Sequence, residues 1–154
     1  MKKTLLLDLD HTLIRPKHGR RFPKTEDDWE FMPGVIDALR RLAADYDGYI
    51  VSNQGGIVHG HTTAAAFAKK AEEIMALINE QGGNIRSCVF SKTNDEHYRK
   101  PGPGMLEILK STGVEVNEPV MVGDMDTDRE FAKNIGARYV DIKYFLKKGL
   151  ETLS

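Results

Sequence analysis

Two acidic residues follow a short apolar segment near the start of the chain. The stretch LLLDLDHTLI, residues 5–14, places Asp8 and Asp10 two residues apart, directly after a run of leucines. A single Asp at the end of a strand is commonly a turn former or a helix cap. A solubility charge would need only one of the two carboxylates, so the pair indicates a metal site or a nucleophile.

A second acidic group occurs in VMVGDMDTD, where Asp124 and Asp128 are four residues apart. Carboxylate clusters suit Mg²⁺, a hard ion that prefers oxygen ligands and also binds substrate phosphate. Asp8 and Asp124 are the natural ligand pair for such an ion. Asp128 would lie on the same face of the following helix, where it can orient a metal-bound water or the isolated Lys100.

Two further polar groups suit the binding of a phosphate. The hydroxyl and backbone N–H groups of Ser52 and Asn53, in IVSNQGGI, can bind phosphate oxygens. Lys100 precedes Pro101, which favours an extended loop over a helix at this position. The ammonium of Lys100 would cancel negative charge at the centre of the site.

The elements that must position these residues alternate between apolar strands and amphipathic helices. This alternation favours an α/β fold with a parallel sheet covered on both faces. The expected strands are 4–9, 48–52, 86–91, 119–123 and 138–142, and the expected helices are 34–45, 63–81, 103–112 and 126–135, followed by a short last helix. Thr63 is expected to cap the second helix and Gly82 to end it.

The candidate residues come after the ends of the first four predicted strands. In parallel sheets, ligands bind beyond the carboxyl ends of the strands. If the strands are parallel, the groups around Asp8, Ser52, Lys100 and Asp124 converge on one edge of the sheet. Each group alone has a plain structural explanation, but four at one edge predict an active site.

The bulk properties predict one domain spanning residues 1–154. The chain has a net charge of −1, so it is not a general electrostatic attractor for nucleic acid or membranes. No stretch approaches the ~18 to 20 apolar residues of a membrane span. A single cysteine, Cys88, excludes an intramolecular disulfide and fits a reducing cytoplasm. We expect Cys88 to be a buried residue of a strand.

Four segments, LLLDLDHTL, IVSNQGGI, YRKPGPGM and VMVGDMDTD, resemble the ordered motifs of the haloacid dehalogenase superfamily. The resemblance implies a three-layer α/β/α Rossmann-like fold, here without a cap domain because the segment from Ile14 to Pro33 is too short for one. An Asp at position 10 favours phosphate chemistry over halide displacement in this superfamily.

The resemblance also implies roles for the candidate residues. Asp8 would attack phosphorus and form an aspartyl-phosphate, and Asp10 would protonate the leaving oxygen and then activate water. Mg²⁺ would be held by the carboxylates of Asp8 and Asp124 and the backbone carbonyl of Asp10, with Asp128 in support. The phosphoryl group would be held by Thr12, Ser52, Asn53 and Lys100.

The insert RPKHGRRFPKTEDDWEFMP suggests a nucleic-acid substrate. Its basic half, which includes Arg20 and Arg21, follows the nucleophile strand and could track a phosphodiester backbone. The alternative is a solvated loop whose basic and acidic charges pair off. Trp29 could stack on a base, but packing against the core is the favoured role. Together with HYRKPGPGM, this insert resembles the phosphatase domain of the polynucleotide kinase 3′-phosphatase family, which removes 3′-phosphates from DNA ends during repair. No P-loop motif is present to suggest a kinase activity.

Other substrates stay open. SNQGGIVHGHTTAAAF also resembles the histidinol-phosphate and heptose-bisphosphate phosphatases, although only Cys88 and His97 occur where many of these have a zinc loop. The leading hypothesis is a Mg²⁺-dependent phosphatase of nucleic-acid 3′ ends. The alternatives are a phosphatase of a sugar phosphate, histidinol phosphate or nucleotide, and a non-catalytic module that binds a phosphorylated ligand. His11, His59 and His61 are further candidate substrate contacts, and the oligomeric state is left open.

Overall fold

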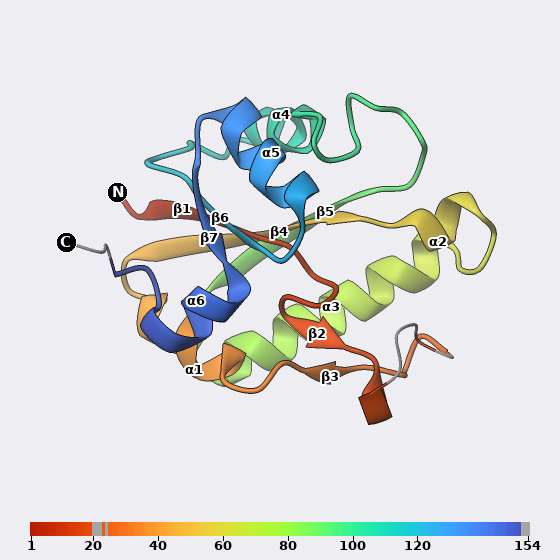
Figure 1. Cartoon of the computed structure of the whole chain (residues 1–154), viewed down its shortest axis with the longest axis horizontal. Coiled ribbons are helices and arrows are strands. Elements are labelled where there is room, and N and C mark those ends of the chain that lie inside the picture. Colours follow the sequence, from red (N-terminus) through yellow and green to blue (C-terminus); the bar gives the residue numbers. More distant parts are fainter. Residues whose placement is uncertain (20–22, 24, 152–154) are drawn as a thin grey trace.

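The computed structural model describes residues 1–19, 23 and 25–151. Its centre is a five-stranded parallel sheet with the strand order β5-β4-β1-β6-β7 (Figure 1). The strands are β1 (Lys3–Leu7), β4 (Tyr46–Asn53), β5 (Ile85–Ser91), β6 (Val120–Gly123) and β7 (Arg138–Asp141). The predicted parallel α/β fold is therefore confirmed.

The leucines after Lys3 form the central strand. Leu5, Leu6 and Leu7 are each at most 2% exposed, because β1 is paired with β4 on one side and β6 on the other. A strand that helices cover on both faces has no polar side, so its sequence is a continuous apolar run. This run ends where Asp8 emerges at the carboxyl edge.

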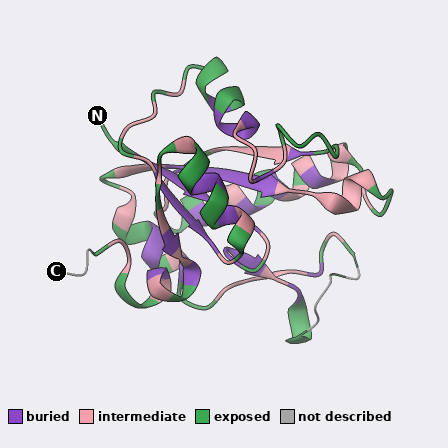
Figure 2. Cartoon of the chain, turned by 45° about the horizontal axis from the view of Figure 1, so that its top comes forward, coloured by how far each residue is buried: buried purple, intermediate pink, exposed green. Residues whose placement is uncertain are grey.

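Helices cover both faces of the sheet and form the two outer layers (Figure 1). One apolar core holds buried residues of α1 (Val35–Leu42), α3 (Ala64–Glu80) and α6 (Ile142–Lys148). A second core, on the opposite face, holds residues of α4 (Gly104–Ser111) and α5 (Asp126–Ile135). Figure 2 shows the sheet as the buried middle layer between these helices. The three-layer α/β/α architecture is confirmed.

The signals at the helix ends act as expected. The Oγ1 atom of Thr63 accepts a hydrogen bond from the backbone N–H of Ala66 at 3.1 Å, which caps the first turn of α3. Beyond its end, Gly82 has a φ of +97°, a conformation that glycine adopts without strain. The cap and the glycine thus account for the position of the longest helix.

The segment after β1 forms a small antiparallel ribbon that the sequence did not predict. Strand β2 (Ile14–Arg15) pairs with β3 (Glu30–Phe31), and the ring of Trp29 lies edge-on to Phe31 at 5.1 Å. Trp29 also packs against the core, which confirms its packing role. The short helix α2 (Gly55–Val58) was likewise not predicted. In the described residues this ribbon takes the place of a cap domain.

No helix in the described part of the chain is long and apolar enough to cross a membrane.

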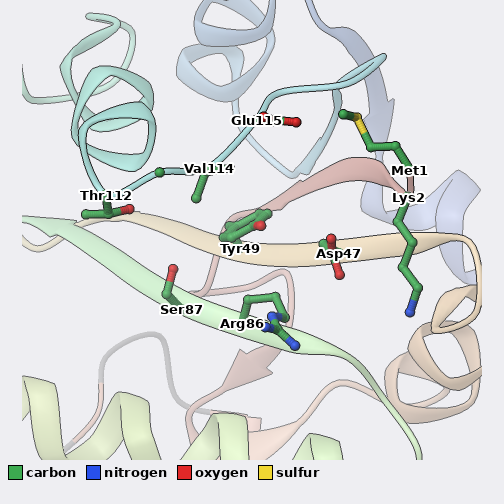
Figure 3. A pocket seen from close by; sticks show the side chains of 10 residues that line it. Met1, Lys2, Asp47, Tyr49, Arg86, Ser87, Thr112, Val114 and Glu115 are labelled. Carbon is green, nitrogen blue, oxygen red and sulfur yellow. The ribbon is translucent and has the colours of Figure 1, made fainter.

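A hollow of about 450 Å³ lies at the amino ends of the strands (Figure 3). It is lined by residues at the starts of β1, β4 and β5 and by the loop after α4, among them Lys2, Asp47, Tyr49, Arg86 and Glu115. This hollow lies at the end of the sheet opposite to the residues singled out from the sequence.

Candidate active site

Asp8 is the first residue beyond the central strand. Its backbone N–H still donates to Val122 O at 3.0 Å, so the sheet ladder extends to this position and fixes its main chain. The Asp8 side chain has little exposure, and its Oδ2 accepts a hydrogen bond from Thr12 Oγ1 at 3.0 Å. Thr12 is fully buried in the turn that follows.

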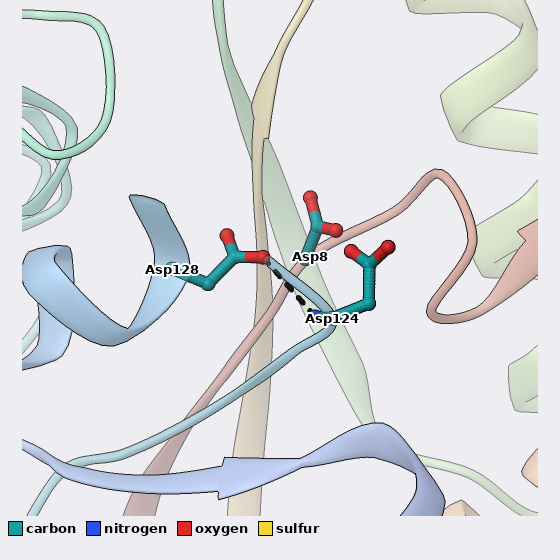
Figure 4. A group of neighbouring side chains, drawn as sticks. All are labelled: Asp8, Asp124 and Asp128. Atoms are coloured by element: carbon teal, nitrogen blue, oxygen red, sulfur yellow. Dashed lines mark hydrogen bonds between the residues drawn. The ribbon is translucent and has the colours of Figure 1, made fainter. Parts of the chain in front are cut away.

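The end of β6 and the first turn of α5 bring a second and a third carboxylate to Asp8. Oxygen atoms of Asp8, Asp124 and Asp128 lie within 4.8 Å of one another (Figure 4). The Oδ2 of Asp128 accepts hydrogen bonds from the backbone N–H groups of Asp124 and Met125, each at 3.2 Å. A Cβ on Gly123 would lie 2.5 Å from the Asp128 carboxyl carbon, so only glycine lets Asp128 fold back over the end of β6.

Lys100 places its ammonium between two of these carboxylates. The Nζ atom lies 2.9 Å from Asp8 Oδ1 and 2.7 Å from Asp128 Oδ1, and the residue is 3% exposed. Burial by itself would lower the pKa of Lys100, but the charges of Asp8 and Asp128 outweigh it and raise the pKa above its ordinary value. Lys100 is therefore a fixed positive charge in the site.

The end of β4 supplies three polar side chains. Ser52 is buried, and its Oγ accepts a hydrogen bond from Gln54 Nε2 at 2.7 Å. The same Gln54 nitrogen donates to Asp10 Oδ2 at 2.9 Å. Asn53 bonds to the main chain of Lys100 through both atoms of its side-chain amide. The sequence placed Gln54 at this strand end but assigned it no role, because its contact with Asp10 exists only in the folded chain.

The acidic cluster carries more negative than positive charge. The cluster holds three carboxylates and one ammonium, which contacts two of them, so two negative charges have no counter-charge if all groups are ionised. Burial, followed by contact with Asp8 and by the charges of Asp8 and Asp128, raises the pKa of Asp124 to about 7. This deficit and the all-oxygen donor set fit a divalent hard cation such as Mg²⁺. Asp8 and Asp124 would hold the ion, with Asp128 beside them.

The other residues singled out from the sequence lie outside the acidic cluster or outside the described residues. His11 is exposed, directly follows Asp10 and has a φ of +60°. His59 and His61 are exposed after α2, with their ring centres 6.3 Å apart. Arg20 and Arg21 lie outside the described residues. Cys88 is only partly buried in β5, and burial raises the pKa of its thiol to about 12.

Known proteins resemble the chain over most of its length. A heptose-1,7-bisphosphate 7-phosphatase of Pseudomonas putida is 31% identical over 98% of this chain and 87% of its own length. The histidine biosynthesis bifunctional protein HisB of Legionella pneumophila is 35% identical, covering 92% of this chain but 42% of the relative. The bifunctional polynucleotide phosphatase/kinase of Schizosaccharomyces pombe is 31% identical over 90% of this chain and 36% of its own length. The chain thus spans less than half of these two bifunctional proteins.

A crystal structure of the heptose-bisphosphate phosphatase from B. bronchiseptica superposes with a TM-score of 0.75 at 25% identity, covering 89% of this chain and 78% of that one. That structure contains magnesium and phosphate. The family model described as polynucleotide kinase 3 phosphatase matches residues 3–145. With this match over nearly its whole length and the fold of a haloacid dehalogenase-type phosphatase, the chain belongs to the polynucleotide kinase 3 phosphatase family.

Proposed function

We propose that this protein is a Mg²⁺-dependent phosphomonoesterase that uses Asp8 as its nucleophile and acts on a small phosphorylated metabolite. The observation that carries the chemistry is the fixed carboxylate of Asp8. Lys100 binds one of its oxygens at 2.9 Å and Thr12 binds the other at 3.0 Å, beside the Asp124 carboxylate. A nucleophile that is already oriented requires little rearrangement to react.

In the first step an oxygen of Asp8 attacks phosphorus and the bond to the leaving oxygen breaks. The carboxylic acid of Asp10 transfers its proton to that oxygen, and the alcohol leaves. In the second step the Asp10 carboxylate takes a proton from water, whose oxygen attacks phosphorus and releases inorganic phosphate from Asp8. Asp10 therefore starts the next cycle in its protonated form.

The side chain of Gln54 orients the acid–base residue in this scheme. Gln54 Nε2 holds Asp10 Oδ2 at 2.9 Å and leaves Oδ1 for proton transfer. The same amide contacts the Ser52 hydroxyl at 2.7 Å, which links the proton-transfer residue to a phosphate-binding candidate. Because Asp10 is only partly buried, its carboxyl group can reach a substrate at the surface.

Charge neutralisation accounts for the remaining residues. The transferring phosphoryl group spreads negative charge over three oxygens, and Asp8 adds another. The Lys100 ammonium offsets part of this charge within a buried setting, where electrostatic stabilisation is strongest. Asp8 and Asp124 would hold a Mg²⁺ ion, which would supply further positive charge and a ligand site for the phosphate.

The relatives and the insert favour a small substrate. The heptose-bisphosphate phosphatase and this chain match over most of both lengths. Three described charges of the insert take part in two ion pairs: Arg15 with Glu30 at 2.9 Å, and Glu26 with Lys70 of α3 at 3.9 Å. Charges paired in this way attract a polyanion less than free ones do. These observations support a sugar phosphate or histidinol phosphate over the leading hypothesis drawn from the sequence.

A nucleic-acid 3′ end is the second candidate. The family match over residues 3–145 and the similarity to the yeast phosphatase/kinase support it. The lack of a cap domain in the described residues also supports it, since a large substrate could approach the carboxyl edge. Arg20 and Arg21 would be the residues to contact a nucleic-acid backbone.

A substrate panel tests both candidates. With saturating Mg²⁺, kcat/KM is measured for sugar phosphates, a sugar bisphosphate, histidinol phosphate, nucleoside monophosphates and a 3′-phosphorylated oligonucleotide. We expect the preferred small ester to exceed the oligonucleotide by about a hundredfold or more, about 2.7 kcal/mol of transition-state discrimination. A preference for the oligonucleotide would select the second candidate. No hydrolysis of any ester would refute the phosphomonoesterase.

A further inference from the structure

The position of the Lys100 ammonium depends on the main chain that carries it. The side chain is a flexible stem of four carbons, and its head must meet Asp8 at 2.9 Å and Asp128 at 2.7 Å. A displacement of the backbone by about 1 Å would be enough to disturb such a site. Lys100 lies in the loop between β5 and α4, outside any regular element that would hold it in place.

Asn53 holds this piece of main chain from both sides. Its Oδ1 accepts a hydrogen bond from the Lys100 N–H at 2.8 Å, and its Nδ2 donates to the Lys100 carbonyl at 3.0 Å. The two residues are 47 positions apart in the chain. The amide thus imitates the pairing of a neighbouring strand and fastens the loop to the end of β4.

The loop that carries Lys100 packs closely against itself at two glycines. A Cβ on Gly102 would clash with Glu96 O, and one on Gly104 would lie 2.7 Å from His97 O. The Gly104 N–H donates to His97 O at 2.7 Å and closes the loop. The loop therefore has a defined internal shape. Asn134 of α5 also holds it, through a hydrogen bond from Nδ2 to the Pro101 carbonyl at 2.9 Å. Asn53 is the side chain that bonds to the main chain of Lys100 itself.

We infer that Asn53 is a positioning residue whose side chain sets Lys100 for the reaction instead of binding the phosphoryl group itself. The proposed phosphomonoesterase activity underlies this inference. The sequence analysis expected Asn53 to hold the phosphoryl group, and this inference assigns its side chain a different role. Because both atoms of its side-chain amide bind the Lys100 main chain, Asn53 would bind phosphate only through its backbone N–H.

The chain contains a matched control for this contact. Asn79 binds the main chain of Ile85 in the same way, with Oδ1 at 2.8 Å from the N–H and Nδ2 at 2.9 Å from the carbonyl. Ile85 begins β5, at the opposite end of that strand from the site. Asn79→Ala therefore removes an equivalent pair of hydrogen bonds where no chemistry is expected.

The test is a double-mutant cycle on the binding of inorganic phosphate, measured by calorimetry with saturating Mg²⁺. We expect Asn53→Ala to weaken phosphate binding about tenfold and Lys100→Met about a hundredfold, with the double variant within about threefold of Lys100→Met. Asn79→Ala should lower the melting temperature and leave phosphate affinity unchanged. These readouts separate positioning from a merely structural role.

Losses that multiply to about a thousandfold in the double variant would mean that Asn53 binds phosphate independently of Lys100, and would overturn the inference. Unchanged affinity in Asn53→Ala would overturn it as well. If Asn53→Ala fails to fold, Asn53→Gln replaces it, because it keeps the amide but is one methylene too long for the Lys100 main chain. Binding without hydrolysis in the wild-type protein would refute the proposed function and leave this cycle valid. A wild-type protein that binds no phosphate would refute both.

Discussion

The two ends of the parallel sheet treat charged residues in opposite ways. At the carboxyl end, Asp8, Lys100 and Asp128 are each at most 8% exposed, and Lys100 forms ion pairs with both carboxylates. At the amino end, Arg86 and Glu115 are exposed around an open hollow (Figure 3). Burying charges costs free energy that exposed charges do not incur. The difference teaches that polarity alone does not mark a site, whereas unbalanced buried charge does.

The sharpest test of this difference removes one carboxylate at each end. Asp8→Asn should lower kcat about a thousandfold or more, because the amide cannot form the covalent intermediate. Asp47→Asn, at the hollow, should leave kcat unchanged. Steady-state assays of purified protein measure both, and circular dichroism checks the fold. Turnover by Asp8→Asn at the wild-type rate would contradict the proposed nucleophile.

Removing one cation at each end should separate activity and stability. Lys100→Met should lower kcat/KM about a hundredfold. It should also destabilise the metal-free protein by about 3–5 kcal/mol, because Asp8 and Asp128 stay buried without their partner. Arg86→Met changes an exposed side chain and should alter stability by no more than about 0.5 kcal/mol. Urea unfolding in the presence of EDTA measures the stability of both variants. Equal losses of stability in Lys100→Met and Arg86→Met would contradict the difference between the two ends of the sheet.

The binding of Mg²⁺ should depend on pH at the carboxyl end alone. The pKa of Asp124 is raised to about 7, so below pH 7 a proton competes with the ion and the affinity should fall by up to about tenfold per pH unit. In the folded metal-free protein this carboxyl binds its proton more tightly than in the unfolded chain. Its contribution to stability is therefore full below about pH 4 and is lost as the pH rises toward 7.

Calorimetric titrations with Mg²⁺ between pH 5.5 and about 8.5 measure this dependence, with Asp124→Asn as the control that lacks the carboxyl. A constant affinity in the wild-type protein over this range would contradict it. EDTA should abolish turnover, and added Mg²⁺ should restore it.

The smallest expected effects come from one added methyl group at each end. Gly123→Ala places a Cβ against Asp128 and should cost about 1–3 kcal/mol of stability and several-fold in kcat/KM. Gly113→Ala, at the hollow, has open space but a φ of +98°, so it should cost about 1 kcal/mol with unchanged kcat/KM. Denaturant unfolding measures the stability of the two variants, and steady-state kinetics measure their kcat/KM. An equal loss of kcat/KM in both variants would contradict a special role for Gly123.

Much of the fold could be predicted from local patterns. The leucines of β1, the Thr63 cap of α3 and the acidic start of α5 are signals carried by neighbouring residues. The ribbon of β2 and β3 was missed because each strand has only two residues, too few for a periodic pattern. The four-residue helix α2 was missed for the same reason.

The sequence by itself determined the residue types of the site and, through the rule for parallel strands, the edge where they meet. Only the tertiary structure decided how they are connected: Gln54 to Asp10, Asn53 to the main chain of Lys100, and Lys100 to two carboxylates. The physical reason is that hydrogen bonds and ion pairs depend on distances of about 3 Å. Those distances are set by how separate elements pack, which the spacing of residues along the chain does not specify.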